Sequence, residues 1–271
     1  MTVQWQGLLK NLGVWKGSFV PFDAFGAQKE GVASDLTLAL SEDQQQVSLC
    51  LNRYPEQRPV KTIEMSFRYP GPGPQIPFLS QGSFSQGPLQ YSSFDRFGAE
   101  LAMIDGDRRL RVVHHYPNGP VFDGLTLICE TRTHEDPSPM LTLESLEGQW
   151  LGQAYSFLSG YRDPIEFQTH LSVKVNGDTL TQTLDLGTQM IQTQGKIQHY
   201  GVEFSQGQQL MRLLLLPGGG SSLCPVDIKS GTEFFLEAGW LVNATLRLRL
   251  IRRYNAKGEW ESLTLVTEKK H

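Results

Sequence analysis

Hydrophobic and polar residues alternate with a period of two along most of this 271-residue chain. That period is typical of β-strands that bury one face. The runs Asp35–Leu40 and Gln46–Leu51 are separated by a short polar turn and predict a β-hairpin. In the second half, His170–Val175 and Thr179–Leu184 flank an Asn-Gly pair, which is a strong signal for a two-residue hairpin turn.

Helical spacing of apolar residues is confined to two short stretches, 3–11 and 140–146. We therefore expect an all-β protein of antiparallel strands, with a short helix at the start of each half. The same alternation predicts further strands over Lys16–Phe22, Thr62–Tyr69, Leu89–Phe94, Ala99–Ile104, Arg109–Tyr116 and Leu125–Arg132.

Each half of the chain carries the same motifs in the same order. Gly-x-Trp-x-Gly occurs at residues 13–17 and again at 148–152. Farther along, Arg109–Tyr116 corresponds to Arg247–Tyr254, and Leu125–Glu130 corresponds to Leu263–Glu268. A unit of half the chain has the size of a small domain and is too long for a solenoid repeat. The sequence thus predicts two domains of one β-fold, residues 1–133 and 140–271, joined by a proline-containing linker at 134–139.

Charge and composition exclude several classes of function. The formal net charge is −4, and no basic stripe is present, so nucleic acid is not expected as a partner. No apolar run approaches the roughly 20 residues of a membrane span. The first residues lack the basic and apolar regions of a secretory signal, so we expect a cytoplasmic protein.

Motifs for catalysis or metal binding are absent from the sequence. It contains neither a nucleophile elbow, a phosphate-binding loop nor Cys-x-x-Cys, and we assign no catalytic residue and no cofactor. The adjacent pair His114 and His115 would point to opposite faces of a strand, so we expect surface histidines rather than a metal site. Enzymatic activity is left open, with a binding function favoured.

A short helix leading into a Gly-x-Trp strand, with an arginine on the last-but-one strand, resembles the calycin (lipocalin-like) superfamily. The tandem arrangement is similar to a family of uncharacterised two-domain calycin proteins found mainly in cyanobacteria. The resemblance implies two tandem antiparallel β-barrels, in which a tryptophan packs across the closed end and an arginine lies over its ring. The corresponding residues here are Trp15 with Arg109 or Arg111, and Trp150 with Arg247 or Arg249.

The second half also resembles the S-type lyases, single calycin barrels that attach bilins to phycobiliprotein cysteines. The resemblance rests on Glu237, Trp240, Asn243 and the Leu-Arg-Leu-Arg run at 246–249. Two residues separate Asn243 from that run, whereas the lyases have the asparagine adjacent to it. The first half has no counterpart of Trp240, so lyase chemistry is not expected there.

The repeated Arg-x-Arg pairs have two interpretations. In the structural one, an arginine covers the tryptophan through a cation–π contact worth about 0.5–2 kcal/mol. In the functional one, an arginine inside the barrel pairs with a ligand carboxylate, such as a tetrapyrrole propionate or a fatty acid. The candidate ligand-binding residues are Arg249, Arg247, Trp240, Glu237 and Arg111.

Three functions remain open on this basis. The first is a binding protein for a small hydrophobic or amphipathic ligand, for which a bilin or related pigment is the leading candidate. The second is a bilin lyase or chromophore chaperone that acts on phycobiliproteins. The third is a protein-interaction module whose barrels are filled by their own side chains.

Overall fold

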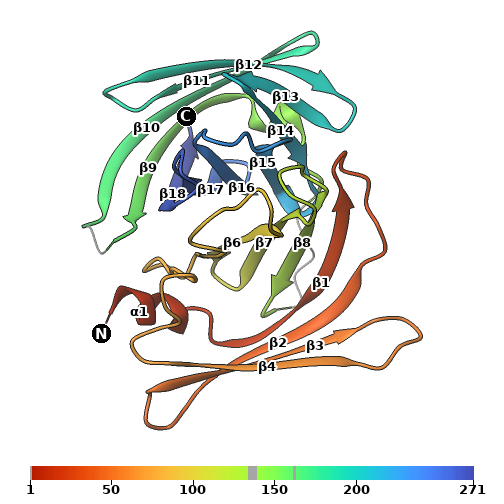
Figure 1. Ribbon diagram of the computed structural model, residues 1–271, viewed down its shortest axis with the longest axis vertical. Coiled ribbons are helices and arrows are strands. Elements are labelled where there is room, and N and C mark those ends of the chain that lie inside the picture. The colour runs from red at the N-terminus through yellow and green to blue at the C-terminus, as the bar shows by residue number, and fades with distance from the viewer. Residues whose placement is uncertain (1, 134–138, 161–162) are drawn as a thin grey trace.

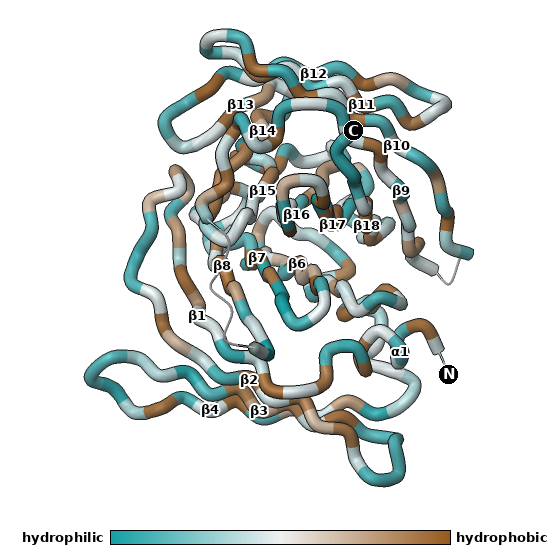
Figure 2. Tube along the Cα trace, turned by 180° about the vertical axis from the view of Figure 1, so that it is seen from behind, coloured by the Kyte–Doolittle hydropathy of each residue, from teal (hydrophilic) through white to brown (hydrophobic). Residues whose placement is uncertain are grey.

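The computed structural model describes residues 2–133, 139–160 and 163–271, and their regular secondary structure is almost entirely β-strand (Figure 1). Each half of the chain forms its own antiparallel sheet, which confirms the predicted all-β, tandem barrel-like fold. Alternating bands of hydrophilic and hydrophobic residues run along the strands in Figure 2. No helix in these residues is long and apolar enough to span a membrane.

The first half is an eight-stranded sheet that curls into an open half-barrel, in the order β4-β3-β2-β1-β8-β7-β6-β5. Its two edges, β4 and β5, do not pair with each other. Its elements are α1 (Val3–Leu9), β1 (Gly13–Asp23), β2 (Val32–Leu40), β3 (Gln46–Tyr54), β4 (Lys61–Arg68), β5 (Phe84–Gln86), β6 (Phe97–Asp105), β7 (Arg108–Tyr116) and β8 (Gly124–Thr131).

The second half is a closed barrel of ten strands, from β10 in chain order to β18 and then β9. Its elements are α2 (Leu143–Leu146), β9 (Gly148–Leu158), β10 (Ile165–Asn176), β11 (Thr179–Asp185), β12 (Met190–Gln198), β13 (Gly201–Gln206), β14 (Gln209–Leu215), η1 (Pro217–Gly219), β15 (Gly220–Pro225), β16 (Phe234–Asn243), β17 (Leu246–Tyr254) and β18 (Trp260–Lys270).

The largest hydrophobic core lies between the two halves rather than inside either one. Strands β6 and β7 pack against β16 and β17, so one face of each sheet is buried at this interface. The buried side chains include Leu101 and Val112 from the first half and Leu236, Trp240 and Leu250 from the second. Smaller cores line the inner faces of the two sheets.

Residues 87–96, which connect β5 to β6, contact the second half of the chain. The predicted strand Leu89–Phe94 is wrong, because the backbone of this segment bonds to the second half instead of extending the first sheet. The Tyr91 N–H donates to the Gly258 carbonyl at 2.7 Å, and the Trp260 N–H donates to the Leu89 carbonyl at 2.8 Å. This segment therefore joins the two halves through backbone hydrogen bonds.

The interface also contains a buried histidine. The expectation that His114 lies on the surface is wrong: its side chain is fully buried, with Nε2 2.8 Å from Ser222 Oγ of the second half. Burial lowers the pKa of His114 to about 3, so the ring is neutral at pH 7. Residues 134–138 of the predicted linker lie outside the described residues, and the domain boundaries stay a prediction.

Candidate functional site: two buried charge clusters

The repeated Gly-x-Trp-x-Gly motif begins the first strand of each half, β1 and β9. Trp15 and Trp150 are fully buried, and each indole N–H donates to a carbonyl four residues earlier, at 2.8 and 2.9 Å. The motif's first glycines, Gly13 and Gly148, have φ of +116° and +122°. Glycine alone adopts this backbone region without strain, so it is required where the helical segment turns into the strand.

Beside Trp15, four side chains form the N-terminal charge cluster: Glu100, Arg109, Arg111 and Glu130. Arg111 donates two hydrogen bonds to Glu130, from Nε at 3.0 Å and Nη2 at 2.9 Å, and one to Glu100 at 2.8 Å. Arg109 Nε donates to the same Glu130 at 2.8 Å. Two arginines thus face two glutamates, and the cluster carries no net charge.

The equivalent positions of the second half form the C-terminal charge cluster: Glu237, Arg247, Arg249 and Glu268. Arg249 forms a bidentate pair with Glu237, in which Nε and Nη2 each donate a hydrogen bond of 2.8 Å to a carboxylate oxygen. Its Nη1 donates to Glu268 at 3.1 Å. Bidentate pairs of this kind are among the strongest protein hydrogen bonds. The repeat has therefore duplicated a neutral ion-pair network as well as a fold.

The two clusters differ at one arginine. Arg109 Nη1 donates to Asn11 Oδ1 at 3.0 Å, which adds a neutral partner to its carboxylate. Its counterpart Arg247 has Glu268 as its only ion pair among the described residues, at 3.6 Å. Among the described residues, each cluster has one buried atom without a hydrogen bond, Arg109 Nη2 in the first and Glu268 Oε2 in the second. The difference between the clusters is that Arg247 is held less closely than Arg109.

Burial and charge act against each other in these clusters. Burial opposes ionisation of Glu130, but the positive charges of Arg109 and Arg111 outweigh it and hold the pKa of Glu130 below its usual value. In the same way, Arg249 overcomes burial and lowers the pKa of Glu237. Burial lowers the pKa of Arg109 to about 10, which still leaves it charged at pH 7. Glu130, Glu237 and Arg109 are therefore ionised at neutral pH.

The structure brings most of the predicted site residues together. Arg249, Arg247 and Glu237 lie in one cluster, and Arg111 occupies the equivalent place in the first half. Trp240 lies apart from them, on the opposite face of β16. There it belongs to the core between the halves and contacts the Arg108 guanidinium, whose central carbon lies 5.6 Å from its ring centroid.

The tryptophan-covering cation differs between the halves. The guanidinium carbon of Arg109 lies 4.3 Å from the Trp15 ring centroid, so Arg109 rather than Arg111 is the predicted arginine over this ring. The guanidinium carbon of Arg132 lies 4.5 Å from the same centroid. Over Trp150 the cation is Lys270, with Nζ at 5.2 Å. Arg132 and Lys270 follow the cluster glutamates by two residues, a spacing that is visible in the sequence.

The sequence interpretation missed the acidic partners Glu100, Glu130 and Glu268. A signal was available for two of them: Glu130 and Glu268 end the matching runs Leu125–Glu130 and Leu263–Glu268. A carboxylate repeated at the end of a strand-like apolar run is expected to have a cationic partner, because an unpaired buried charge is costly.

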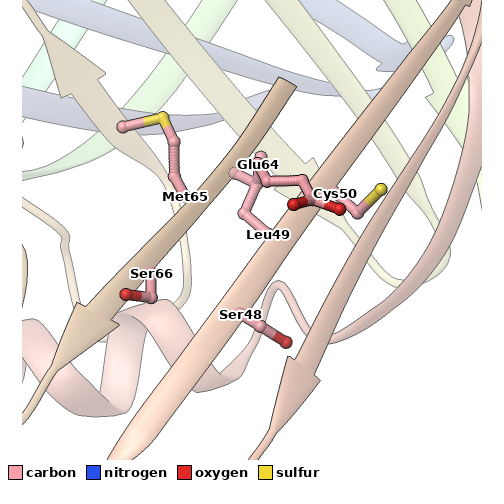
Figure 3. A pocket seen from close by; sticks show the side chains of 6 residues that line it. All are labelled: Ser48, Leu49, Cys50, Glu64, Met65 and Ser66. Atoms are coloured by element: carbon pink, nitrogen blue, oxygen red, sulfur yellow. The ribbon is translucent and has the colours of Figure 1, made fainter. Parts of the chain in front are cut away.

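A shallow depression lies outside the clusters, across β3 and β4 of the open sheet (Figure 3). It is lined by Ser48, Leu49, Cys50, Glu64, Met65 and Ser66. Within the described ranges, no group of three or more His, Cys, Asp or Glu side chains is arranged to hold a metal ion.

Comparison with known proteins identifies the family. Residues 1–135 match the family model described as "Domain of unknown function (DUF3598), N-terminal", and residues 137–271 match "Biogenesis factor required for ATP synthase 1, C-terminal domain". A crystal structure of a DUF3598 family protein of unknown function from Nostoc punctiforme is 37% identical, with a TM-score of 0.92 and 100% coverage of both chains. The chain belongs to the DUF3598 family.

More distant structures add nothing to this assignment. Transferrin binding protein B from Haemophilus parasuis is 9% identical, with a TM-score of 0.30 and coverage of 91% of this chain and 55% of that one. Kievitone hydratase from Nectria haematococca is 8% identical, with a TM-score of 0.22 and coverage of 100% and 93%. No protein with a curated description matches. The likeness to bilin lyases stays a prediction from the sequence.

Proposed function

We propose that this DUF3598 protein is a non-catalytic assembly factor that binds a partner protein with its outer surface. The main support for the proposal is that both charge clusters are electrically neutral by themselves, which leaves no free arginine in either cluster to bind a ligand carboxylate. Each arginine that was a candidate anchor for a ligand carboxylate already pairs with a glutamate of its own half. A ligand anion would have to displace a buried carboxylate, which is costly.

An exposed aromatic side chain supports a protein partner. Phe94 is 96% exposed and lies in the segment that joins the two halves. Val121, which is 55% exposed, belongs to a neighbouring loop that bonds to the second half. Aromatic residues are enriched at protein interfaces, where they supply large apolar contact areas.

The family match of the second half suggests which partner to test. That family is named for a biogenesis factor required for ATP synthase. We extend this role to the present chain and infer that its partner is a component of the ATP synthase or of its assembly.

The test is retention of purified ATP synthase subunits on the immobilised full-length chain. We expect at least one subunit to be retained, and Phe94→Ala to weaken its retention about tenfold, as for an interface residue worth more than 1 kcal/mol. Met190→Ala is the matched control, because Met190 is also exposed but lies in a hairpin of the second barrel. If the folded protein retains none of the subunits, the proposal is wrong.

A second candidate is a small amphipathic ligand inside the second barrel, with a bilin as the pigment suggested by the sequence. The long ion pair of Arg247 favours it, because this buried guanidinium lies 3.6 Å from Glu268 and a ligand acceptor would add a closer partner. Titration with a free bilin should then give a saturable absorbance shift that is lost in a folded Arg247→Ala variant. A flat titration would remove this candidate. Transfer to a phycobiliprotein cysteine would be a further step, supported only by the sequence resemblance.

A further inference from the structure

Strand β4 is an open edge of the first sheet, and the hydrogen-bond pattern determines which of its groups face outward. The Tyr69 N–H donates to the Gln45 carbonyl at 2.9 Å, so this pair is of the hydrogen-bonded kind. Such pairs alternate along antiparallel strands, and Gln46 lies opposite Arg68. The backbone groups of Thr62, Glu64 and Ser66 therefore point away from β3, toward the open edge.

Nothing in the described residues covers this edge. Thr62, Glu64 and Ser66 are exposed, and Met65 between them is 47% exposed although it is apolar. Unpaired strand edges are normally blocked by proline, by bulges or by charged side chains, because they otherwise pair with another chain. Strand β4 has charges near its ends, at Lys61 and Arg68, and one in its centre, Glu64. Here the inward-facing side chains of the central part are Ile63, Met65 and Phe67, which favour pairing rather than block it.

We propose that this edge pairs with the same edge of a second copy, as an antiparallel β4–β4 ribbon around a two-fold axis at Met65. Glu64 then lies opposite Ser66 of the second copy, and each pair exchanges two backbone hydrogen bonds. Apolar positions meet on the inner face, with Met65 opposite Met65 and Ile63 opposite Phe67. On the outer face, Glu64 lies diagonally across from both Arg68 and Glu64 of the second copy, so an attractive charge pair accompanies a repulsive one at the same diagonal spacing.

Neighbouring registers are worse for identifiable reasons. In β4, the even-numbered residues point their N–H and C=O groups toward the open edge. A hydrogen-bonded ribbon must therefore place even-numbered residues of one copy opposite even-numbered residues of the other. A ribbon centred on Glu64 would place the two Glu64 carboxylates directly opposite each other, which is destabilising. A ribbon centred on Ser66 would place Thr62 opposite Pro70, which has no N–H to donate. The register at Met65 avoids both problems.

Sedimentation velocity over a range of concentrations tests the proposal. We expect a species of twice the 30.4 kDa chain mass. Glu64→Pro should weaken the dimer about tenfold or more, because each copy loses an N–H that faces the edge and not β3. Glu64→Gln, the matched control, keeps this N–H and should remain dimeric. A monomer at all concentrations, or a dimer indifferent to Glu64→Pro, overturns the proposal and leaves the edge to a different partner.

Cysteine cross-linking tests the register even if Glu64→Pro fails to fold. In a Cys50→Ser background, Met65→Cys should form a disulfide-linked dimer on mild oxidation. The two Cα atoms of a directly opposed pair lie about 4.5–5.5 Å apart, within the range of a disulfide. Thr62→Cys should not cross-link to itself, since the two copies would be offset by six residues, about 20 Å. Equal cross-linking at both positions would contradict this register.

Discussion

The eight charged side chains inside the two halves act as paired structural groups. Each cluster has two arginines and two glutamates, and the central carboxylates Glu130 and Glu268 are at most 4% exposed. Replacing such a network by apolar residues can be neutral, but removing one partner leaves an uncompensated buried charge. The arginines are therefore expected to determine stability before they determine any binding.

Removing Arg249 tests this role. Arg249→Ala leaves Glu237 and Glu268 buried without their main partner and should lower the free energy of unfolding by about 3–5 kcal/mol. Urea unfolding measures the loss. Arg253→Ala is the matched control, because Arg253 is 52% exposed and its ion pairs should contribute less than about 1 kcal/mol. Equal effects of the two substitutions would show that the cluster is not a structural network.

Acidification should destabilise the protein through the same carboxylates. Because the folded-state pKa of Glu237 lies below its ordinary value of 4.5, its stabilising contribution is complete above that value and is lost as pH falls through the folded pKa. Thermal unfolding between pH 7 and pH 3 should show this loss. Glu237→Gln should be less stable at pH 7 and should lose less on acidification. A parallel pH dependence in the two proteins would rule out this contribution.

At the scale of the elements, the period-two pattern and the internal repeat correctly predict the two helices, the tandem arrangement and the strands named from the sequence, except for Leu89–Phe94. Glu237 was among the predicted site residues, but the pairing of Glu130 and Glu268 with the arginines could not be predicted, because strand register decides it. Glu268 lies directly opposite Arg247 in the neighbouring strand, a proximity that spacing along one strand does not reveal. The non-strand course of residues 89–94 was equally unpredictable, because it involves the contact of Leu89 with Trp260, far away in the sequence.

The second glycine of the motif gives a test at this scale. A Cβ on Gly152 would lie 2.2 Å from Thr169 Oγ1 and 2.9 Å from Val266 Cγ1, because β9 passes close to both neighbouring strands here. Gly152→Ala should therefore cost about 1–3 kcal/mol of stability in chemical denaturation. Leu151→Ala, on the exposed face of the same strand, should cost much less. If the two substitutions cost the same stability, the close approach of the neighbouring strands at Gly152 does not exclude a side chain there.

At the scale of the whole molecule, the two halves share one core and should unfold together. Arg252 of the second half is fully buried and donates hydrogen bonds to the Gly87 and Pro88 carbonyls of the first half, at 3.1 and 3.0 Å. Trp240, Leu236 and Leu250 of the second half pack against β6 and β7 of the first half in the same core. Such a joint is expected to hold the halves in one fixed arrangement.

Truncating the interface should weaken both halves. Trp240→Ala should cost about 3–5 kcal/mol, because a buried aromatic side chain is replaced by a cavity. Hydrogen exchange should then show reduced protection in β6 and β7 of the first half as well as in β16 and β17 of the second. Met190→Ala should leave both regions unchanged. Loss of protection confined to the second half would mean that the two sheets unfold independently.

The central claim is that this DUF3598 protein assists assembly of a larger complex, and the amount of assembled ATP synthase tests it most directly. We would delete the gene in the source organism and quantify intact ATP synthase on native gels, with and without the reintroduced wild-type chain. The account predicts a clear loss of the assembled enzyme that the wild-type chain restores. An unchanged amount of ATP synthase in the deletion strain would contradict it.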